Sequence, residues 1–200
     1  MRVLIFTIGK TAVGKTTLAK RVAKKLKFEY LSEGSIKKSL VEKYTYKESL
    51  SETLRNFGYK KTIKMSTVLL KNKNVIIDAS FHKKFRRKWL YDSLRRRVDL
   101  LVAIYIDCPN KTKIISRINK RKLMPKNSEN QADSIKVYNK ISKEFNVPNI
   151  TEFSIEADSA IIFINTDTNE ISKTQIKIKN KKSELFFTKL IKHIIKNLGK

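Results

Sequence analysis

A short segment near the start of the chain has the residue types and spacing of a phosphate-binding loop. It reads GKTAVGKT over residues 9–16 and fits the pattern G-x-x-x-x-G-K-[S/T]. Glycines at both ends of this pattern allow main-chain N–H groups and the following helix N-terminus to converge on phosphate oxygens. In this pattern Lys15 reaches the β- and γ-phosphates, and the Thr16 hydroxyl binds Mg²⁺. The segment therefore predicts a nucleoside triphosphate site made by Gly9, Lys10, Thr11, Ala12, Val13, Gly14, Lys15, Thr16 and Thr17.

The residues on either side of this loop are those that the pattern requires. An apolar run, Val3–Ile8, leads directly into it, and Thr16–Leu26 leads out with Leu18, Val22 and Leu26 on one helical face. The chain has only 5 glycines, so two at the two required positions are hard to ascribe to chance. No N-K-x-D segment for reading guanine is present, which argues against a GTPase.

Further apolar runs predict the strands that must position this loop. They are continuous stretches of Val, Ile and Leu, as expected of parallel strands covered on both faces. The predicted strands are Val3–Ile8, Phe28–Leu31, Val75–Ile77, Leu100–Ile106 and Ala160–Ile164. Because helical stretches alternate with them, we expect an α/β fold, a three-layer P-loop NTPase fold with a mostly parallel five-stranded sheet.

Amphipathic stretches between the strands predict the covering helices. These are Ser35–Tyr44, about Glu48–Leu70, Lys84–Arg97 and a basic C-terminal helix at about 184–198. We expect residues 1–200 to form one domain with a small lid at about 117–134. The lysine-rich stretch Thr174–Ser183 is expected to be an exposed ribbon or loop.

The chain is strongly basic, with 45 Lys+Arg against 18 Asp+Glu and a formal net charge of +27. Two interpretations stay open: an anionic partner such as nucleic acid, or a coding bias toward lysine. A cluster of basic residues at 83–97 favours the first, because a bias should not concentrate arginine, and it makes nucleic acid a possible partner. The single cysteine, Cys108, and the lack of a signal-peptide or membrane-spanning pattern lead us to expect a cytoplasmic protein without a membrane partner.

The ordered motifs resemble those of the small P-loop kinases that are often labelled AAA-family ATPases. This group includes polynucleotide kinase, phosphoseryl-tRNA kinase, zeta-toxin-like kinases and, more remotely, gluconate and nucleoside monophosphate kinases. The resemblance spans about Arg2 to Thr168. It rests on the loop, on VIIDASF at 75–81 followed by Arg86-Arg87, and on IYIDCP at 104–109 followed by Arg117 and Arg121.

The resemblance implies roles for several of these residues. Asp78, at the end of an apolar strand, would hold Mg²⁺, although an Asp there also suits a helix cap. Arg117 and Arg121, four residues apart on one helical face, would clamp the phosphates, although they also suit a solvated surface. Thr166 and Asp167, after the last strand, would hold the adenine edge, although Asn165–Thr168 also suits an Asx turn.

The chain departs from this group at the acceptor side. Members usually carry an Asp soon after the second strand, whereas this chain reads LSEGSIKK over 31–38. Glu33 is the only carboxylate nearby, and Asp78 is the alternative base if it does not bind metal. Glu33 and Ser35 also suit the start of a helix.

The leading hypothesis is thus an ATP-dependent phosphotransferase, a kinase that moves the γ-phosphate of ATP to a hydroxyl of a small molecule or nucleic acid, with ATP and Mg²⁺ as cofactors. Lys15, Asp78, Arg117, Arg121 and Glu33 are its candidate catalytic residues. Two alternatives remain: a nucleoside monophosphate kinase, and a nucleotide-dependent RNA-binding or assembly ATPase with no acceptor other than water.

Overall fold

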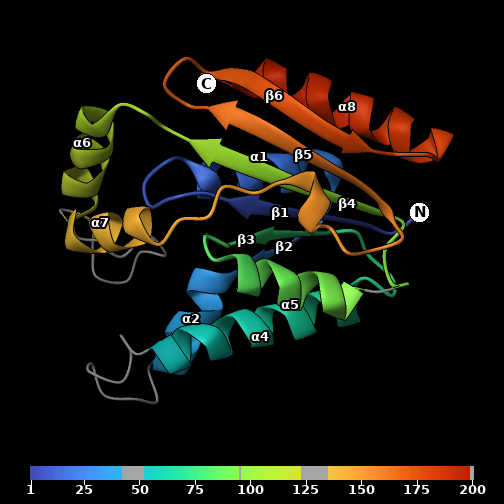
Figure 1. Cartoon of the computed structure of the whole chain (residues 1–200), viewed down its shortest axis with the longest axis horizontal. Coiled ribbons are helices and arrows are strands. Elements are labelled where there is room, and N and C mark those ends of the chain that lie inside the picture. Colours follow the sequence, from blue (N-terminus) through green and yellow to red (C-terminus); the bar gives the residue numbers. More distant parts are fainter. Residues whose placement is uncertain (42–51, 95, 123–134, 199–200) are drawn as a thin grey trace.

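A computed structural model describes residues 1–41, 52–94, 96–122 and 135–198, and Figure 1 shows how these parts are arranged. One mixed sheet of six strands runs through the molecule in the order β2-β3-β1-β4-β5-β6. Its strands are β1 Val3–Ile8, β2 Glu29–Ser32, β3 Val75–Asp78, β4 Leu100–Asp107, β5 Asp158–Asn165 and β6 Glu170–Lys177. Within the described ranges, no helix is both long and apolar enough to cross a membrane.

Five of these strands are parallel and correspond to the apolar runs of the sequence. The strand β1 lies at the centre, with Leu4 opposite Val75 of β3 and Leu101 of β4. Every residue of β1 is buried because helices cover both faces of the sheet. The α/β class and the mostly parallel sheet are therefore confirmed.

Helices form the two outer layers of the fold. They are α1 Lys15–Leu26, α2 Glu33–Val41, α4 Glu52–Leu69, α5 Lys84–Leu94, α6 Lys111–Lys122, α7 Ile135–Lys143 and α8 Lys181–Asn197. The side chains on one face of the sheet pack against α1, α6 and α8. Those on the other face pack against α4 and α5 (Figure 1). Of the predicted lid, residues 117–122 belong to α6, and residues 123–134 lie outside the described part.

The sixth strand corrects the expectation of five strands, and it makes the first part of the stretch 174–183 an exposed strand, in agreement with the exposed ribbon expected there. Strand β6 pairs antiparallel with β5, with Ile162 opposite Thr174, and α8 begins at Lys181. Its residues are mostly exposed, so it lacks the apolar run by which the other strands are recognised. Lysine-rich composition is a common property of an edge strand, because charge there discourages pairing with other chains.

The basic cluster at 83–97, from which an anionic partner is expected, does not offer its two central arginines to such a partner. Arg86 is 1% exposed and Arg87 is fully buried. The guanidinium of Arg87 makes a two-pronged ion pair with Glu152 at 2.9 and 3.0 Å, and it also donates to the carbonyl oxygens of Phe81 and Asn146. Thus Arg87 ties the β3–α5 turn to two later segments of the chain.

We expect Arg87→Met to lower the free energy of unfolding by about 3–5 kcal/mol, because it leaves the Glu152 carboxylate buried without its partner. Lys88→Met, one residue further along α5, removes an exposed ion pair with Asp92 and should change stability by no more than about 0.5 kcal/mol. Urea denaturation of both variants measures the difference. Equal stability of the two variants would contradict the assignment of Arg87 as a buried tie.

Candidate functional site

The segment 9–16 forms a tight loop between the end of β1 and the start of α1. Gly9 has a φ of +155°, and a Cβ there would overlap the carbonyl oxygen of Ile106 in β4. Its N–H donates to the Ser80 carbonyl at 3.0 Å, so the loop is also tied to the residues after β3. Gly14 has a φ of +103° and immediately precedes α1. Both glycines are therefore required by the backbone, as the motif predicts.

Side chains from two later elements reach this loop. Arg117 of α6 donates to the Ala12 carbonyl at 3.1 Å, and the Thr166 hydroxyl donates to the Val13 carbonyl at 3.0 Å. The ammonium of Lys15 donates to the Lys10 carbonyl within the loop. Arg121 lies one turn beyond Arg117 on α6 and is half-buried. The structure thus brings Lys15, Arg117 and Thr166 together, although they are far apart in the sequence.

The loop after β5 forms the Asx turn that the sequence also allowed. The Asp167 N–H donates to the Asn165 side chain at 2.8 Å, and the Asp167 carboxylate pairs with Lys113 of α6. The hydroxyl of Thr166 also donates to the Asp107 carbonyl at the end of β4, at 3.2 Å. This turn therefore connects β4, α6 and the phosphate loop. Thr17 of α1, by contrast, is exposed and is not part of this connection.

Asp78 lies at the end of β3 and is 6% exposed. Its two carboxylate oxygens accept hydrogen bonds from the Thr7 hydroxyl at 3.3 Å and the Tyr30 hydroxyl at 2.9 Å. Among the described residues it makes no hydrogen bond with Thr16, and no group of three or more His, Cys, Asp or Glu could hold a metal there. The Thr16 hydroxyl and the Asp78 carboxylate are nevertheless hard oxygen donors, of the kind that Mg²⁺ binds together with phosphates and water.

Glu33 is the first residue of α2, directly after β2. The helix cap is supplied by its neighbour, since the Ser32 hydroxyl accepts the Ser35 N–H at 3.2 Å. The Glu33 side chain is then turned toward α4, where its Oε1 lies 3.2 Å from the position that a Cβ on Gly58 would take. Burial raises the pKa of Glu33, and the charges of Lys37, Arg86 and Arg55 offset part of that rise.

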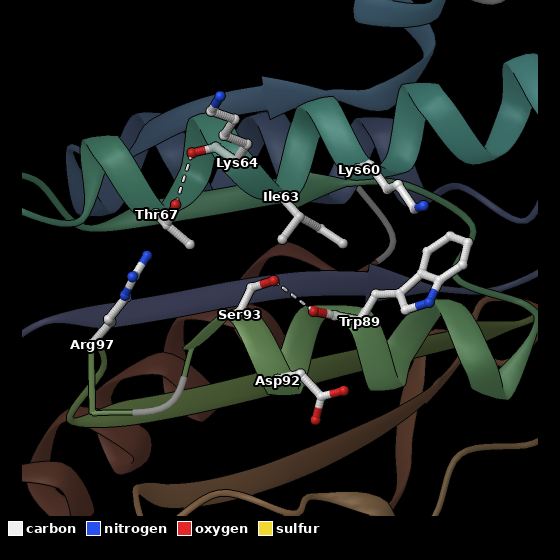
Figure 2. A pocket seen from close by; sticks show the side chains of 8 residues that line it. All are labelled: Lys60, Ile63, Lys64, Thr67, Trp89, Asp92, Ser93 and Arg97. Atoms are coloured by element: carbon white, nitrogen blue, oxygen red, sulfur yellow. Dashed lines mark hydrogen bonds between the residues drawn. The ribbon is translucent and has the colours of Figure 1, made fainter.

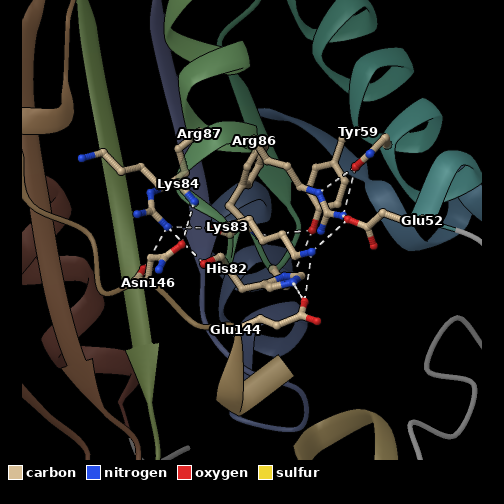
Figure 3. A network of polar contacts seen from close by, with 12 residues as sticks. Glu52, Tyr59, His82, Lys83, Lys84, Arg86, Arg87, Glu144 and Asn146 are labelled. Atoms are coloured by element: carbon tan, nitrogen blue, oxygen red, sulfur yellow. Dashed lines mark hydrogen bonds and ion pairs between the residues drawn. The ribbon is translucent and has the colours of Figure 1, made fainter. Parts of the chain in front are cut away.

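A polar network beside Glu33 was not anticipated from the sequence (Figure 3). The guanidinium of Arg86 lies 4.6 Å from the centre of the Tyr59 ring and pairs with Glu52 at the start of α4. Lys83 pairs with Glu52 and, at 3.0 Å, with Glu144 after α7. No local pattern reveals these contacts, because their partners are far apart in the chain.

The network continues to the residues that hold the phosphate loop. The Tyr59 hydroxyl lies 3.0 Å from the Ser80 hydroxyl, which lies 2.8 Å from Nδ1 of His82. Burial, reinforced by the charges of Arg86 and Lys83, lowers the pKa of His82 to about 3. His82 is therefore neutral at physiological pH and acts as a hydrogen-bonding partner of Ser80.

A phosphate loop at the carboxyl edge of a central parallel strand, with a carboxylate on the neighbouring strand, defines a small P-loop kinase-like fold. The chain matches the AAA_33 family, described as an AAA domain, over residues 4–141, and it belongs to that family. A search of curated proteins found no match.

Similar folds occur among solved structures. A gluconokinase from Sinorhizobium meliloti 1021 has a TM-score of 0.57 at 10% identity, over 99% of this chain and 95% of that one. A Janibacter sugar kinase has a TM-score of 0.55 at 15% identity, over 82% and 85%. Chaetomium thermophilum Kti12 in complex with ADP-AlF3 has a TM-score of 0.63 at 16% identity, over 96% and 98%. At these identities the likeness shows the fold alone.

The two loop glycines should respond differently to the same substitution. Gly14→Ala makes only an ordinary contact, at 3.8 Å from the Thr166 methyl, but has a strained φ, so it should cost about 1–2 kcal/mol of stability. Gly9→Ala adds an overlap with a main-chain carbonyl of β4, so it should cost clearly more and should also abolish ATP binding. Denaturation and calorimetric titration with ATP measure both effects. A Gly9→Ala variant as stable as Gly14→Ala would contradict the close approach of Gly9 to β4.

Proposed function

We propose that the chain is an ATP-dependent kinase that transfers the γ-phosphate of ATP to a hydroxyl group. The observation that carries this proposal is the half-buried carboxylate of Glu33, whose pKa is raised and which lies at the same sheet edge as the phosphate loop. A protein that only binds a nucleotide has no need of a desolvated base at this edge, whereas transfer to a hydroxyl does. The gluconokinase and the sugar kinase are kinases with a similar fold, and the proposal carries that class of reaction over to this chain.

On the nucleotide side, the loop N–H groups and Lys15 would bind the triphosphate. Thr166 and Asp167, in the turn beside the loop, would contact the adenine edge. Thr16 and Asp78 would hold Mg²⁺, which when bound neutralises charge on the phosphate oxygens. Asp78 suits this role better than that of a base, because hydroxyl hydrogen bonds from Thr7 and Tyr30 already hold its carboxylate in place.

On the acceptor side, Glu33 would accept the proton of the attacking hydroxyl. The acceptor oxygen forms a bond to the γ-phosphorus while the bond from that phosphorus to the β,γ-bridging oxygen breaks, and ADP leaves with the electron pair. Arg117 and Arg121 would offset negative charge on the transferring group. Because the transition state is loose, positioning and charge neutralisation supply most of the rate enhancement.

The basic surroundings of Glu33 favour a second candidate, a nucleoside monophosphate kinase. Lys37 and Arg55 lie near enough to Glu33 to lower its pKa, so positive charges surround the proposed base. An acceptor that itself carries a phosphate would suit such surroundings. A panel of ATP assays with sugars, nucleosides, nucleoside monophosphates, 5′-hydroxyl oligonucleotides and tRNA separates the candidates, and transfer to water alone would contradict both.

Lys15→Ala should reduce phosphate transfer from ATP by about 100-fold or more, because the lysine stabilises charge on the β- and γ-phosphates. Lys24→Ala, an exposed lysine on the same helix, should leave the rate unchanged. Release of ADP in a coupled assay measures both. Unaltered transfer by the Lys15 variant would refute the phosphate site.

Glu33→Gln should reduce transfer by about 10²–10⁴-fold while ATP affinity stays unchanged, because it removes only the proton acceptor. In the wild type, transfer should rise with pH as the raised-pKa carboxyl loses its proton. Glu29→Gln, at the other end of β2 and paired with Lys73, is the matched control and should retain full activity.

The same variant has a predictable effect on stability. Because the folded-state pKa of Glu33 lies above its unfolded value, the wild type loses stability as pH rises from the ordinary range of a glutamate through that raised value. Glu33→Gln lacks this loss and should be more stable than the wild type at neutral pH, with the difference closing in acid. Thermal unfolding across pH measures it, and a variant that is less stable at neutral pH would contradict the raised pKa.

A further inference from the structure

A surface groove lies between α4 and α5, on the face of the sheet opposite α1 (Figure 2). Its volume is about 420 Å³. The lining residues come from successive turns of both helices and from the segment after α5: Lys60, Ile63, Lys64, Thr67, Trp89, Asp92, Ser93 and Arg97. None of them belongs to the phosphate loop or to the surroundings of Glu33, so the groove is a separate feature.

The charge of this groove is positive. Lys60, Lys64 and Arg97 are exposed along it. Its one acidic residue, Asp92, is already paired with Lys88 at 2.8 Å. The groove therefore presents cations to an incoming ligand. The Asp92 carboxylate of the groove is already neutralised by its ion pair.

One aromatic side chain, Trp89, lines the groove beside these cations, and Phe85 contacts it. The Lys60 ammonium lies 5.0 Å from the centre of the half-buried Trp89 ring, as Figure 2 shows. The Phe85 ring is 40% exposed and makes an edge contact with Trp89 at 5.0 Å between ring centres. Phe57, three residues before Lys60 on α4, is 53% exposed. Exposed rings of this size cost solvation free energy unless a partner covers them.

The groove is elongated, and its cations are spaced along it. Lys60 and Lys64 are one helical turn apart, so their Cα atoms are separated by roughly 6 Å along α4. Arg97 lies beyond the C-terminal end of α5, and Trp89 lies in the middle of that helix. An extended chain with regularly spaced anions matches this arrangement better than one compact small molecule does.

We propose that this groove binds single-stranded nucleic acid, with backbone phosphates on Lys60, Lys64 and Arg97 and a base stacked near Trp89 and Phe85. Cations that follow a backbone, interleaved with aromatic rings on which bases stack, are the combination that binds single strands without sequence preference. This site goes beyond the proposed kinase activity and does not depend on it.

The proposal differs from a general effect of positive charge, and a matched variant tests that difference. Lys60→Gln/Lys64→Gln/Arg97→Gln removes three groove cations. Lys182→Gln/Lys189→Gln/Lys192→Gln removes three exposed cations from α8, on the opposite face of the sheet. The two triple variants carry the same net charge, so only the position of the lost cations differs.

Binding of a fluorescein-labelled 12-nucleotide oligouridylate, followed by anisotropy across salt concentrations, is the first measurement. For a wild type that uses three groove phosphate contacts, the groove variant should reduce the slope of log K against log[salt] by about 2, because each single-strand contact contributes about 0.7. The α8 variant should keep the wild-type slope. Equal losses in the two variants would overturn the proposal in favour of non-specific charge.

Trp89 supplies a second measurement, because it is the only tryptophan of the chain. We expect unlabelled oligouridylate to quench its fluorescence, and poly-glutamate at the same charge concentration to leave it unchanged. Trp89→Leu should weaken binding roughly five- to 150-fold by removing the stacking face, whereas Trp89→Phe should recover most of it. Quenching by poly-glutamate, or a Trp89→Phe variant as weak as Trp89→Leu, would overturn the assignment.

The kinase and the groove can fail independently. Lys15→Ala should retain oligonucleotide binding, and the groove variant should retain binding of ATP. Circular dichroism and thermal unfolding confirm that each variant is folded. If Lys15→Ala alone abolished oligonucleotide binding, the nucleic acid would be held at the phosphate loop, and the groove proposal would be wrong.

Discussion

The close approach of Gly9 to β4 is the contact on which the rest of the site depends. At this position the chain leaves β1 with a φ that other residues rarely adopt, and its Cα lies against the Ile106 carbonyl. The Gly9 N–H simultaneously bonds to the Ser80 carbonyl after β3. One glycine thus joins the ends of three neighbouring strands. Since phosphate binding needs the loop N–H groups to converge, this backbone geometry precedes any side-chain chemistry.

The parallel sheet brings the reactive side chains to the same edge. In a parallel sheet all carboxyl ends meet at one edge, so Asp78 and Glu33 follow adjacent strands beside the phosphate loop. Their separation along the sequence has no bearing on this. Their surroundings then give the two carboxylates different properties: hydroxyl donors hold the buried Asp78, whereas the half-buried Glu33 lies against Gly58 and loses part of its hydration. The same edge can therefore supply one carboxylate suited to a cation and another suited to a proton.

The predictability of each feature depended on how local its cause is. The buried strands were evident because burial on both faces requires continuous apolar residues, and the phosphate loop because its backbone requires glycines at fixed positions. Strand β6 was not predicted, because it is an edge strand held by main-chain pairing with β5. Such pairing requires no apolar pattern in the sequence. The burial of Arg86 and Arg87 could not be predicted, because it depends on ion pairs with Glu52 and Glu152. No spacing rule connects these glutamates to the arginines. The roles assigned to the site residues stay predictions from the sequence, and activity measurements test them.

The net charge of +27 consists of groups with different physical roles. Arg86 is paired with the exposed carboxylate of Glu52 and Arg87 with the buried carboxylate of Glu152, so both stabilise the packing of α5 and contribute little to the field outside. In the groove between α4 and α5, exposed cations, an acid already paired with a lysine and the half-buried Trp89 ring occur together. Coding bias can raise the number of lysines, but it does not place aromatic rings among them. The combination of cations and rings is what favours a polyanionic partner.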